Sequence, residues 1–204
     1  MKKILCIALL GFGFLINAQN DVPKTATDIS PLLISEKIAD LKLKTADDAE
    51  VGLASLFSQK PTILVFYRGG WCPYCNIHLS ALGEAEKELL ELGYQIIAIS
   101  PDAPKNLKIT EEKDKAKYLL LSDSKGELAK MMGIAFQAPN NYKSVLSKGS
   151  DGINTTLLPV PSVFIVNTDG IIEFEFISPD YKHRITNDLL IAVAKSLKEK
   201  SSKE

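Results

Sequence analysis

Short apolar runs alternate with amphipathic stretches along most of this 204-residue chain, and this alternation limits the folds that it can adopt. The run "KPTILVFY" (60–67) has no helical period and is typical of a buried central strand. Residues 73–92 follow with a helical pattern in which Leu79, Leu82 and Leu89 mark one face. Gly93 fits the C-terminal cap of that helix.

The same alternation continues to the C-terminus. We expect strands at 94–100, 117–123, 162–167 and 171–177, and helices at about 104–117, 124–132 and 184–200. The tight turn "TDG" joins the last two strands as a hairpin. Residues 137–158 are long for a plain loop, so this segment is either functional or contains a short helix. The pattern predicts a three-layer α/β domain.

The N-terminus has the features of a secretory signal peptide. Lys2 and Lys3 precede a run of about thirteen apolar residues, which is shorter than the roughly 20 that span a bilayer. We expect cleavage near Ala18–Gln19, with an uncleaved anchor as the alternative. The predicted organisation is a signal peptide at 1–18, a polar leader at 19–35 and one domain at 36–204. The mature protein is then secreted or periplasmic and does not span a membrane.

Charge and cysteine content narrow the possible functions. The net charge of −1 gives no reason to expect nucleic acid as a partner. Cleavage would remove Cys6 and leave Cys72 and Cys75, in a compartment where a disulfide is permitted. No G-x-G-x-x-G loop follows a strand, so we expect no nucleotide. The expected redox group is the Cys72–Cys75 disulfide itself, with no other cofactor and no metal.

The segment "FYRGGWCPYCN" (66–76) holds these two cysteines in a C-x-x-C pair, which has three common uses. A structural zinc ion needs four ligands, and the remaining candidates are His78 and the distant His183. A structural disulfide across so short a loop removes little chain entropy. Redox chemistry remains, and a C-x-x-C beside strand–helix–strand patterning is a recognised sign of it.

The expected local structure favours Cys72 as the reactive sulfur. Pro73 suits the first helical position, which makes Cys72 the N-cap residue. The free amides and the helix dipole would stabilise a thiolate there and lower its pKa. Cys75, one turn further on, would resolve the mixed disulfide. Trp71 offers an apolar surface to a partner or packs internally, and an exposed Tyr74 would tune specificity.

The chain resembles the AhpC/TSA (peroxiredoxin-like) family, in the branch that carries C-x-x-C. The resemblance rests on "ILVFYRGGWCPYC", "IIAIS", "LLSDSKGELAKMMGI" and "LPVPSVFIVNTDGIIEFEFISPDY", which occur in the family's order. It implies a thioredoxin-like fold, with a central mixed β-sheet flanked by helices. It also implies an antioxidant or thiol-redox enzyme whose partners are protein or small-molecule thiols, disulfides or peroxides, and a reducing or oxidising protein.

Two departures from the family pattern bear on the mechanism. The typical P-x-x-x-T-x-x-C reads here as Arg68-x-x-x-Cys72-x-x-Cys75, which puts Cys75 at the family's peroxidatic position. The family's late-strand arginine is replaced by Pro161, which resembles the cis-proline of thioredoxins. We therefore expect a cis bond before Pro161 that leaves the Val160 backbone free to pair with an extended peptide.

These features favour an extracytoplasmic thiol–disulfide oxidoreductase in which Cys72 attacks and Cys75 resolves. The first alternative is a thiol-dependent peroxidase with Cys75 as the peroxidatic cysteine, in which Arg68 or Arg184 replaces the missing donors. An alternative of another class is a non-catalytic binding domain with a structural disulfide. Arg184, in "PDYKHR", otherwise reads as a solvated residue at the start of the last helix.

Overall fold

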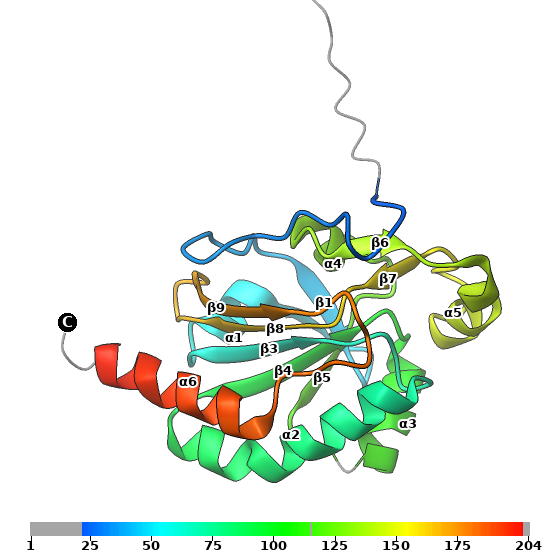
Figure 1. Cartoon of the computed structure of the whole chain (residues 1–204). Helices are drawn as coiled ribbons and strands as arrows, with labels where there is room; N and C mark the ends of the chain where they lie inside the picture. The colour runs from blue at the N-terminus through cyan, green and yellow to red at the C-terminus, as the bar shows by residue number, and fades with distance from the viewer. Residues whose placement is uncertain (1–21, 115, 202–204) are drawn as a thin grey trace, which may run out of the picture.

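The computed structural model describes residues 22–114 and 116–201, and a mixed sheet lies at its centre (Figure 1). The seven strands of this sheet are in the order β2-β1-β5-β4-β3-β8-β9. The central strands β3, β4 and β5 are parallel, whereas β8 and β9 add antiparallel pairs at one side of them. A short pair, β6 and β7, stands apart from the main sheet. The predicted central mixed sheet flanked by helices is confirmed.

The strands are β1 Lys42–Thr45, β2 Glu50–Gly52, β3 Thr62–Phe66, β4 Gln95–Ser100, β5 Leu119–Ser122, β6 Ala135–Gln137, β7 Leu157–Pro159, β8 Ser162–Val166 and β9 Ile172–Ile177. The helices are α1 Leu53–Phe57, α2 Pro73–Glu91, α3 Pro104–Asp114, α4 Glu127–Met131, the 3₁₀ turn η1 Asn140–Tyr142, α5 Lys143–Gly149 and α6 Asn187–Ser201. Sequence patterns predicted the larger elements but missed β1, β2, α1, β6 and β7. No helix within the described residues is long and apolar enough to cross a membrane.

Two apolar cores cover the two faces of the sheet. Side chains alternate along β3, so that Ile63 and Val65 point to one face and Leu64 and Phe66 to the other. The first core lies under α2, α3 and α6, and the second lies under α1 and α4 (Figure 1). The cysteines belong to the first core, where α2 begins.

The N-terminal segment lies along the second core. Residues 22–35, drawn in dark blue in Figure 1, have no helix or strand of their own. Their backbone bonds attach them to the domain, since Gln137 N donates to Pro23 O (2.7 Å) and Leu32 N donates to Met132 O (3.0 Å). The predicted signal peptide and its cleavage point lie outside the described residues and stay predictions.

The prediction of a cis bond before Pro161 is wrong, because the described residues contain no cis peptide bond. The chain runs from β7 directly into β8, and its backbone groups are already bonded. Val160 N donates to Ile134 O (2.8 Å), and the Ser162 hydroxyl donates to Val160 O (2.8 Å). Pro161 O accepts from Ser178 N (3.1 Å). The Val160 backbone is therefore not free to pair with an incoming peptide.

Candidate active site

The end of β3 and the start of α2 place the cysteine pair. Cys72 is the N-cap residue with an extended backbone (φ −91°, ψ 115°), and Pro73 is the first residue of the helix, as predicted. Cys72 N donates to Gly69 O (3.1 Å), and the side-chain amide of Asn76 donates to Gly70 O (3.0 Å). These bonds tie the loop to the first turn of α2 and fix the position of Cys72.

Both sulfurs are enclosed, and both thiols are free. Cys72 is 2% exposed and Cys75 is 0% exposed, so a large substrate has no direct path to either sulfur. The expected capping bond from the Cys72 side chain is not formed with full hydrogen-bond geometry. The Cys75 amide nevertheless acts on the Cys72 sulfur and helps to lower its pKa.

The two cysteines have opposite acidities. A hydrogen bond from the Cys75 thiol lowers the pKa of Cys72 to about 6; burial opposes this shift, while the Cys75 amide and the guanidinium groups of Arg68 and Arg184 add to it. The same thiol–thiolate bond raises the pKa of Cys75 well above its ordinary value, and burial acts in the same direction. The pair therefore carries one thiolate, on Cys72, and one thiol, on Cys75.

Arg184 comes from the segment between β9 and α6 and reaches the cysteine pair. Its Nη2 lies 3.7 Å from Cys75 Sγ, and its Nη1 donates to His183 O (3.0 Å). The expectation of a solvated residue at the start of the last helix is wrong, because Arg184 is half-buried, contacts Cys75 and precedes α6, which begins at Asn187. Arg184 thus places a cation at the sulfur that stands in the family's peroxidatic position.

Arg68 lies in the loop after β3 and is 4% exposed. Its guanidinium carbon lies 4.2 Å from the ring centroid of Tyr181, 4.5 Å from that of Tyr142 and 5.2 Å from that of Trp71. Its Nε is buried and has no hydrogen-bond partner among the described residues. We call Trp71, Tyr142 and Tyr181 the ring cage.

The structure brings most of the predicted site residues to the start of α2. Trp71 is half-buried and packs its ring 5.6 Å from that of Tyr142. Tyr74 is exposed, as expected, and its ring lies 5.6 Å from that of Tyr181.

His78 is buried; burial and the charge of Arg184 lower its pKa to about 4, so this imidazole is neutral at pH 7. Val160 and Pro161 are not bonded to the site: the Val160 backbone donates to Ile134, and the Pro161 carbonyl accepts from Ser178.

Three residues near the cysteines were missed by sequence reasoning. Tyr142 lies in the segment 137–158, which is long for a plain loop, and Tyr181 lies in "PDYKHR" close to Arg184. Asp102 follows β4, and its Oδ2 accepts a hydrogen bond from Gly70 N (2.7 Å). The unusual length of 137–158 was the one signal that pointed to a role for Tyr142.

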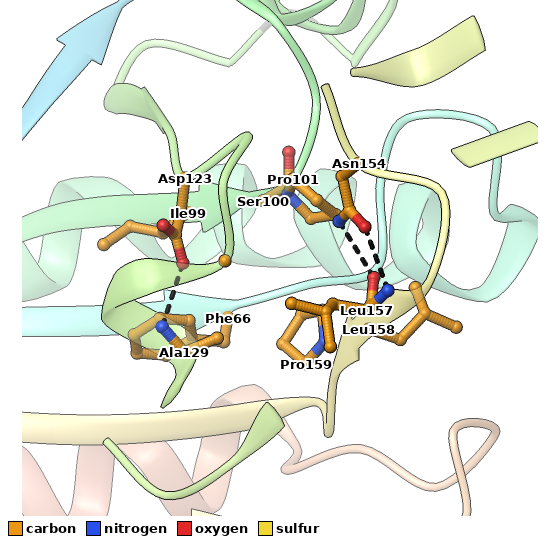
Figure 2. A pocket seen from close by; sticks show the side chains of 11 residues that line it. Phe66, Ile99, Ser100, Pro101, Asp123, Ala129, Asn154, Leu157, Leu158 and Pro159 are labelled. Carbon is orange, nitrogen blue, oxygen red and sulfur yellow. Dashed lines mark hydrogen bonds between the residues drawn. The ribbon is translucent and has the colours of Figure 1, made fainter. Parts of the chain in front are cut away.

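A further pocket lies on the face of the sheet that belongs to the second core (Figure 2). Its lining includes Phe66, Asp123 and Asn154. Asp123 Oδ2 accepts from Ala129 N (2.9 Å), and Asn154 exchanges hydrogen bonds with the Leu157 backbone (2.9 and 3.0 Å). These polar groups stabilise α4 and the loop before β7, so the pocket lacks the reactive groups of the cysteine site.

A metal site needs several ligands in one place. Among residues 22–114 and 116–201, no three His, Cys, Asp or Glu side chains lie close enough together to hold a metal ion. The cysteine pair, two guanidinium groups and a neutral histidine instead form a site that can carry thiol chemistry.

Comparison with known proteins agrees with this chemistry. The AhpC/TSA family model matches residues 34–175. Peroxiredoxin Bcp of Escherichia coli K12 is 26% identical over 163 residues, which cover 80% of this chain and 96% of the relative. A thioredoxin-like protein of Haemophilus influenzae is 29% identical over 126 residues, which cover 61% of this chain and 71% of the relative.

Solved structures share the fold. Peroxidoxin BcpB of Mycobacterium tuberculosis superposes with a TM-score of 0.65 at 21% identity and covers 80% of this chain and 97% of that one. Reduced Prx3 of Vibrio vulnificus superposes with a TM-score of 0.69 at 15% identity, over 80% of this chain and 99% of that one. The resemblance found in the sequence is thereby confirmed: the chain belongs to the AhpC/TSA family and is a peroxiredoxin-like oxidoreductase of thioredoxin fold.

Proposed function

We propose that the protein is a thiol-dependent peroxidase in which Cys72 attacks the peroxide and Cys75 resolves the product. One arrangement carries this proposal: Cys72 caps the N-terminus of α2, Cys75 follows one turn later, and Arg184 Nη2 lies 3.7 Å from the Cys75 sulfur. A hydrogen bond from the Cys75 thiol lowers the pKa of Cys72 to about 6, and the two guanidinium groups act in the same direction. A thiolate is the nucleophilic form of cysteine, and this pKa keeps most of Cys72 in that form at pH 7.

The reaction runs in three balanced steps. The Cys72 thiolate attacks one peroxide oxygen, the O–O bond breaks, and the other oxygen leaves as an alkoxide or hydroxide that takes up a proton. Cys72 is then a sulfenic acid. The Cys75 thiol attacks this sulfur, which forms the Cys72–Cys75 disulfide and releases water. An external dithiol reduces the disulfide by thiol–disulfide exchange.

The enclosure of the site supports a small oxidant. Cys72 is 2% exposed, and the Val160 backbone, which would have paired with an extended peptide, is bonded to Ile134 and Ser162. Sequence reasoning favoured disulfide substrates because it expected that backbone to be free. With the backbone occupied, a peroxide fits the site better than an extended polypeptide does.

Two arginines supply the positive charge that the departing oxygen needs. Arg184 Nη2 lies 3.7 Å from Cys75 Sγ, and the Arg68 charge acts on Cys72. Donors aimed at a developing oxyanion in an enclosed site are worth about 3 to 4 kcal/mol each in other enzymes. These two side chains take the place of the threonine and arginine that the chain lacks.

Stopped-flow mixing with peroxide tests the proposal. The reduced protein should be oxidised much faster than a free thiol and should form one intramolecular disulfide. Cys72→Ser should lose the reaction, whereas Cys75→Ser should keep the first step and accumulate a sulfenic acid on Cys72. If the sulfenic acid instead forms only in Cys72→Ser, the attacking sulfur is Cys75, as in the family pattern. Oxidation no faster than that of a free thiol would refute a peroxidase.

Thiol–disulfide exchange with protein substrates is a second candidate function. A C-x-x-C pair at a helix N-terminus with an acidic first sulfur favours it. The test is reduction of a protein disulfide such as that of insulin, compared with reduction of a small disulfide under the same conditions. Turnover of the protein substrate at rates above those with peroxide would make this function the principal one.

We also propose that the protein acts outside the cytoplasm. The support is the N-terminal sequence, with Lys2 and Lys3 before a short apolar run. Expression of the full chain followed by fractionation and N-terminal sequencing tests this, with Gln19 expected as the first residue. A cytoplasmic product that keeps Met1 would contradict the proposal.

A further inference from the structure

We propose that Tyr142 and Tyr181 are positioning residues for the reaction, which hold Arg68 as the counter-cation of the Cys72 thiolate. The inference rests on the proposed attack by Cys72. It assigns a function to two segments, 138–156 and 178–184, that contribute no reacting atom.

The geometry of the ring cage is the first support. Tyr142 belongs to η1 and Tyr181 to the segment after β9, yet both rings lie within 4.5 Å of the Arg68 guanidinium carbon. The faces of aromatic rings attract cations, and the attraction is stronger when water is excluded. Arg68 is 4% exposed, so its contacts are of this desolvated kind.

The charge balance is the second support. A buried guanidinium normally has a carboxylate partner, because an uncompensated buried charge is costly. Among the described residues, the ion pairs do not include Arg68, and its Nε lacks an acceptor. Aromatic rings supply polarisable surface without a negative charge. The Arg68 charge acts on Cys72, which lies in the same loop before α2, and the stabilisation between the guanidinium and the Cys72 thiolate is mutual.

The other groups that act on Cys72 limit how far the ring cage can lower the pKa of Cys72. Cys75 is the largest influence on its acidity, and the charge of Arg184 acts in the same direction as that of Arg68. The remaining titratable side chains around the pair are the buried Tyr67, His78 and Asp102 and the phenols of the cage itself. Asp102 is the carboxylate in this set; its Oδ2 accepts from Gly70 N, and no ion pair joins it to Arg68 among the described residues.

The test measures the pH midpoint of Cys72 alkylation by iodoacetamide, a neutral reagent, in a Cys75→Ser background that leaves one thiol at the site. Tyr142→Ala and Tyr181→Ala should each raise the midpoint, by up to about one unit, because Arg68 is no longer held near the sulfur. Well below the midpoint, one unit lowers the thiolate population, and so the alkylation rate, about tenfold. Near pH 8 the alkylation rates of the alanine variants and of the Cys75→Ser background should differ little.

Matched variants separate positioning from folding. Tyr142→Phe and Tyr181→Phe keep the rings and should keep the midpoint, whereas Arg68→Met should raise it at least as far as the alanine variants do. Ile153→Ala alters an exposed side chain in the same segment as Tyr142 and should change nothing. An unchanged midpoint in both alanine variants overturns the inference, and so does an equal loss of rate at every pH. Because alkylation needs no peroxide, failure of the peroxidase proposal would appear separately.

Discussion

At the scale of single residues, the acidity of Cys72 depends mainly on the thiol next to it. The hydrogen bond from Cys75 is the largest cause of the lowered pKa, ahead of the two arginines. Because the pKa of Cys72 is about 6, its reactive thiolate fraction increases as the pH rises through this value. Reactivity should therefore rise with pH through a midpoint of about 6 and level off by about pH 8.

This dependence predicts a difference between two substitutions at one position. Cys75→Ala removes the donor and should raise the pKa of Cys72 by more than about one unit. Cys75→Ser keeps an O–H donor in nearly the same place and should shift the pKa less. Absorbance of the thiolate at about 240 nm against pH measures both. Equal shifts in the two variants would show that the hydrogen bond is not the main cause.

The sequence was informative for residues whose position follows from local rules. Cys72, Pro73 and Cys75 could be placed because N-cap and first-turn preferences act over a few residues. The ring cage could not be predicted, since it joins three loops that are distant in the chain. The error at Pro161 has a similar origin: the partner of Val160 N is Ile134, beside a short strand that the sequence did not predict.

At the scale of elements, length and continuous burial decided most of what could be recognised, although the short β5 and α4 were also predicted. Strands β3, β4 and β8 are runs of buried residues, and α2 spans 19 residues with a clear apolar face. The elements that were missed, such as β2, β6 and α1, have three to five residues. Such segments are too short for a periodic pattern, so they are defined by the partner against which they pack.

The loop before α2 and the helix itself respond in opposite ways to the same substitution. Gly69 has φ +136°, and a Cβ there would overlap the Trp71 indole nitrogen and lie 2.9 Å from Asp102 Oδ1. Gly69→Ala should therefore destabilise the protein by about 1 to 3 kcal/mol and lower peroxidase activity, because the loop carries Cys72.

Gly83→Ala is the matched control within α2. A Cβ at Gly83 meets nothing within 4 Å, and alanine is the better helix former. This variant should gain up to about 1 kcal/mol with unchanged activity. Denaturant unfolding of both variants measures the free energies. A stable, fully active Gly69→Ala protein would mean that the loop adapts to the added methyl group.

At the scale of the whole molecule, buried carboxylates connect stability to pH. Asp102 is 3% exposed, and burial raises its pKa to about 6. Its value in the unfolded chain is near 3.8. Between about pH 4 and pH 6 the folded protein therefore binds more protons at this residue than the unfolded chain does. The free energy of unfolding falls as the pH rises through this window, by up to roughly 3 kcal/mol for two pKa units.

Asp102→Asn should remove this dependence, because an amide stays neutral and its oxygen can still accept from Gly70 N. The variant should be about as stable as the wild type near pH 4 and more stable at pH 7. Asp169→Asn, in the exposed turn between β8 and β9, should show no such difference. Urea unfolding of the three proteins at pH 4, 5, 6 and 7 measures the effect. A constant difference between Asp102→Asn and the wild type across this range would mean that Asp102 ionises in the folded protein as it does in the unfolded chain.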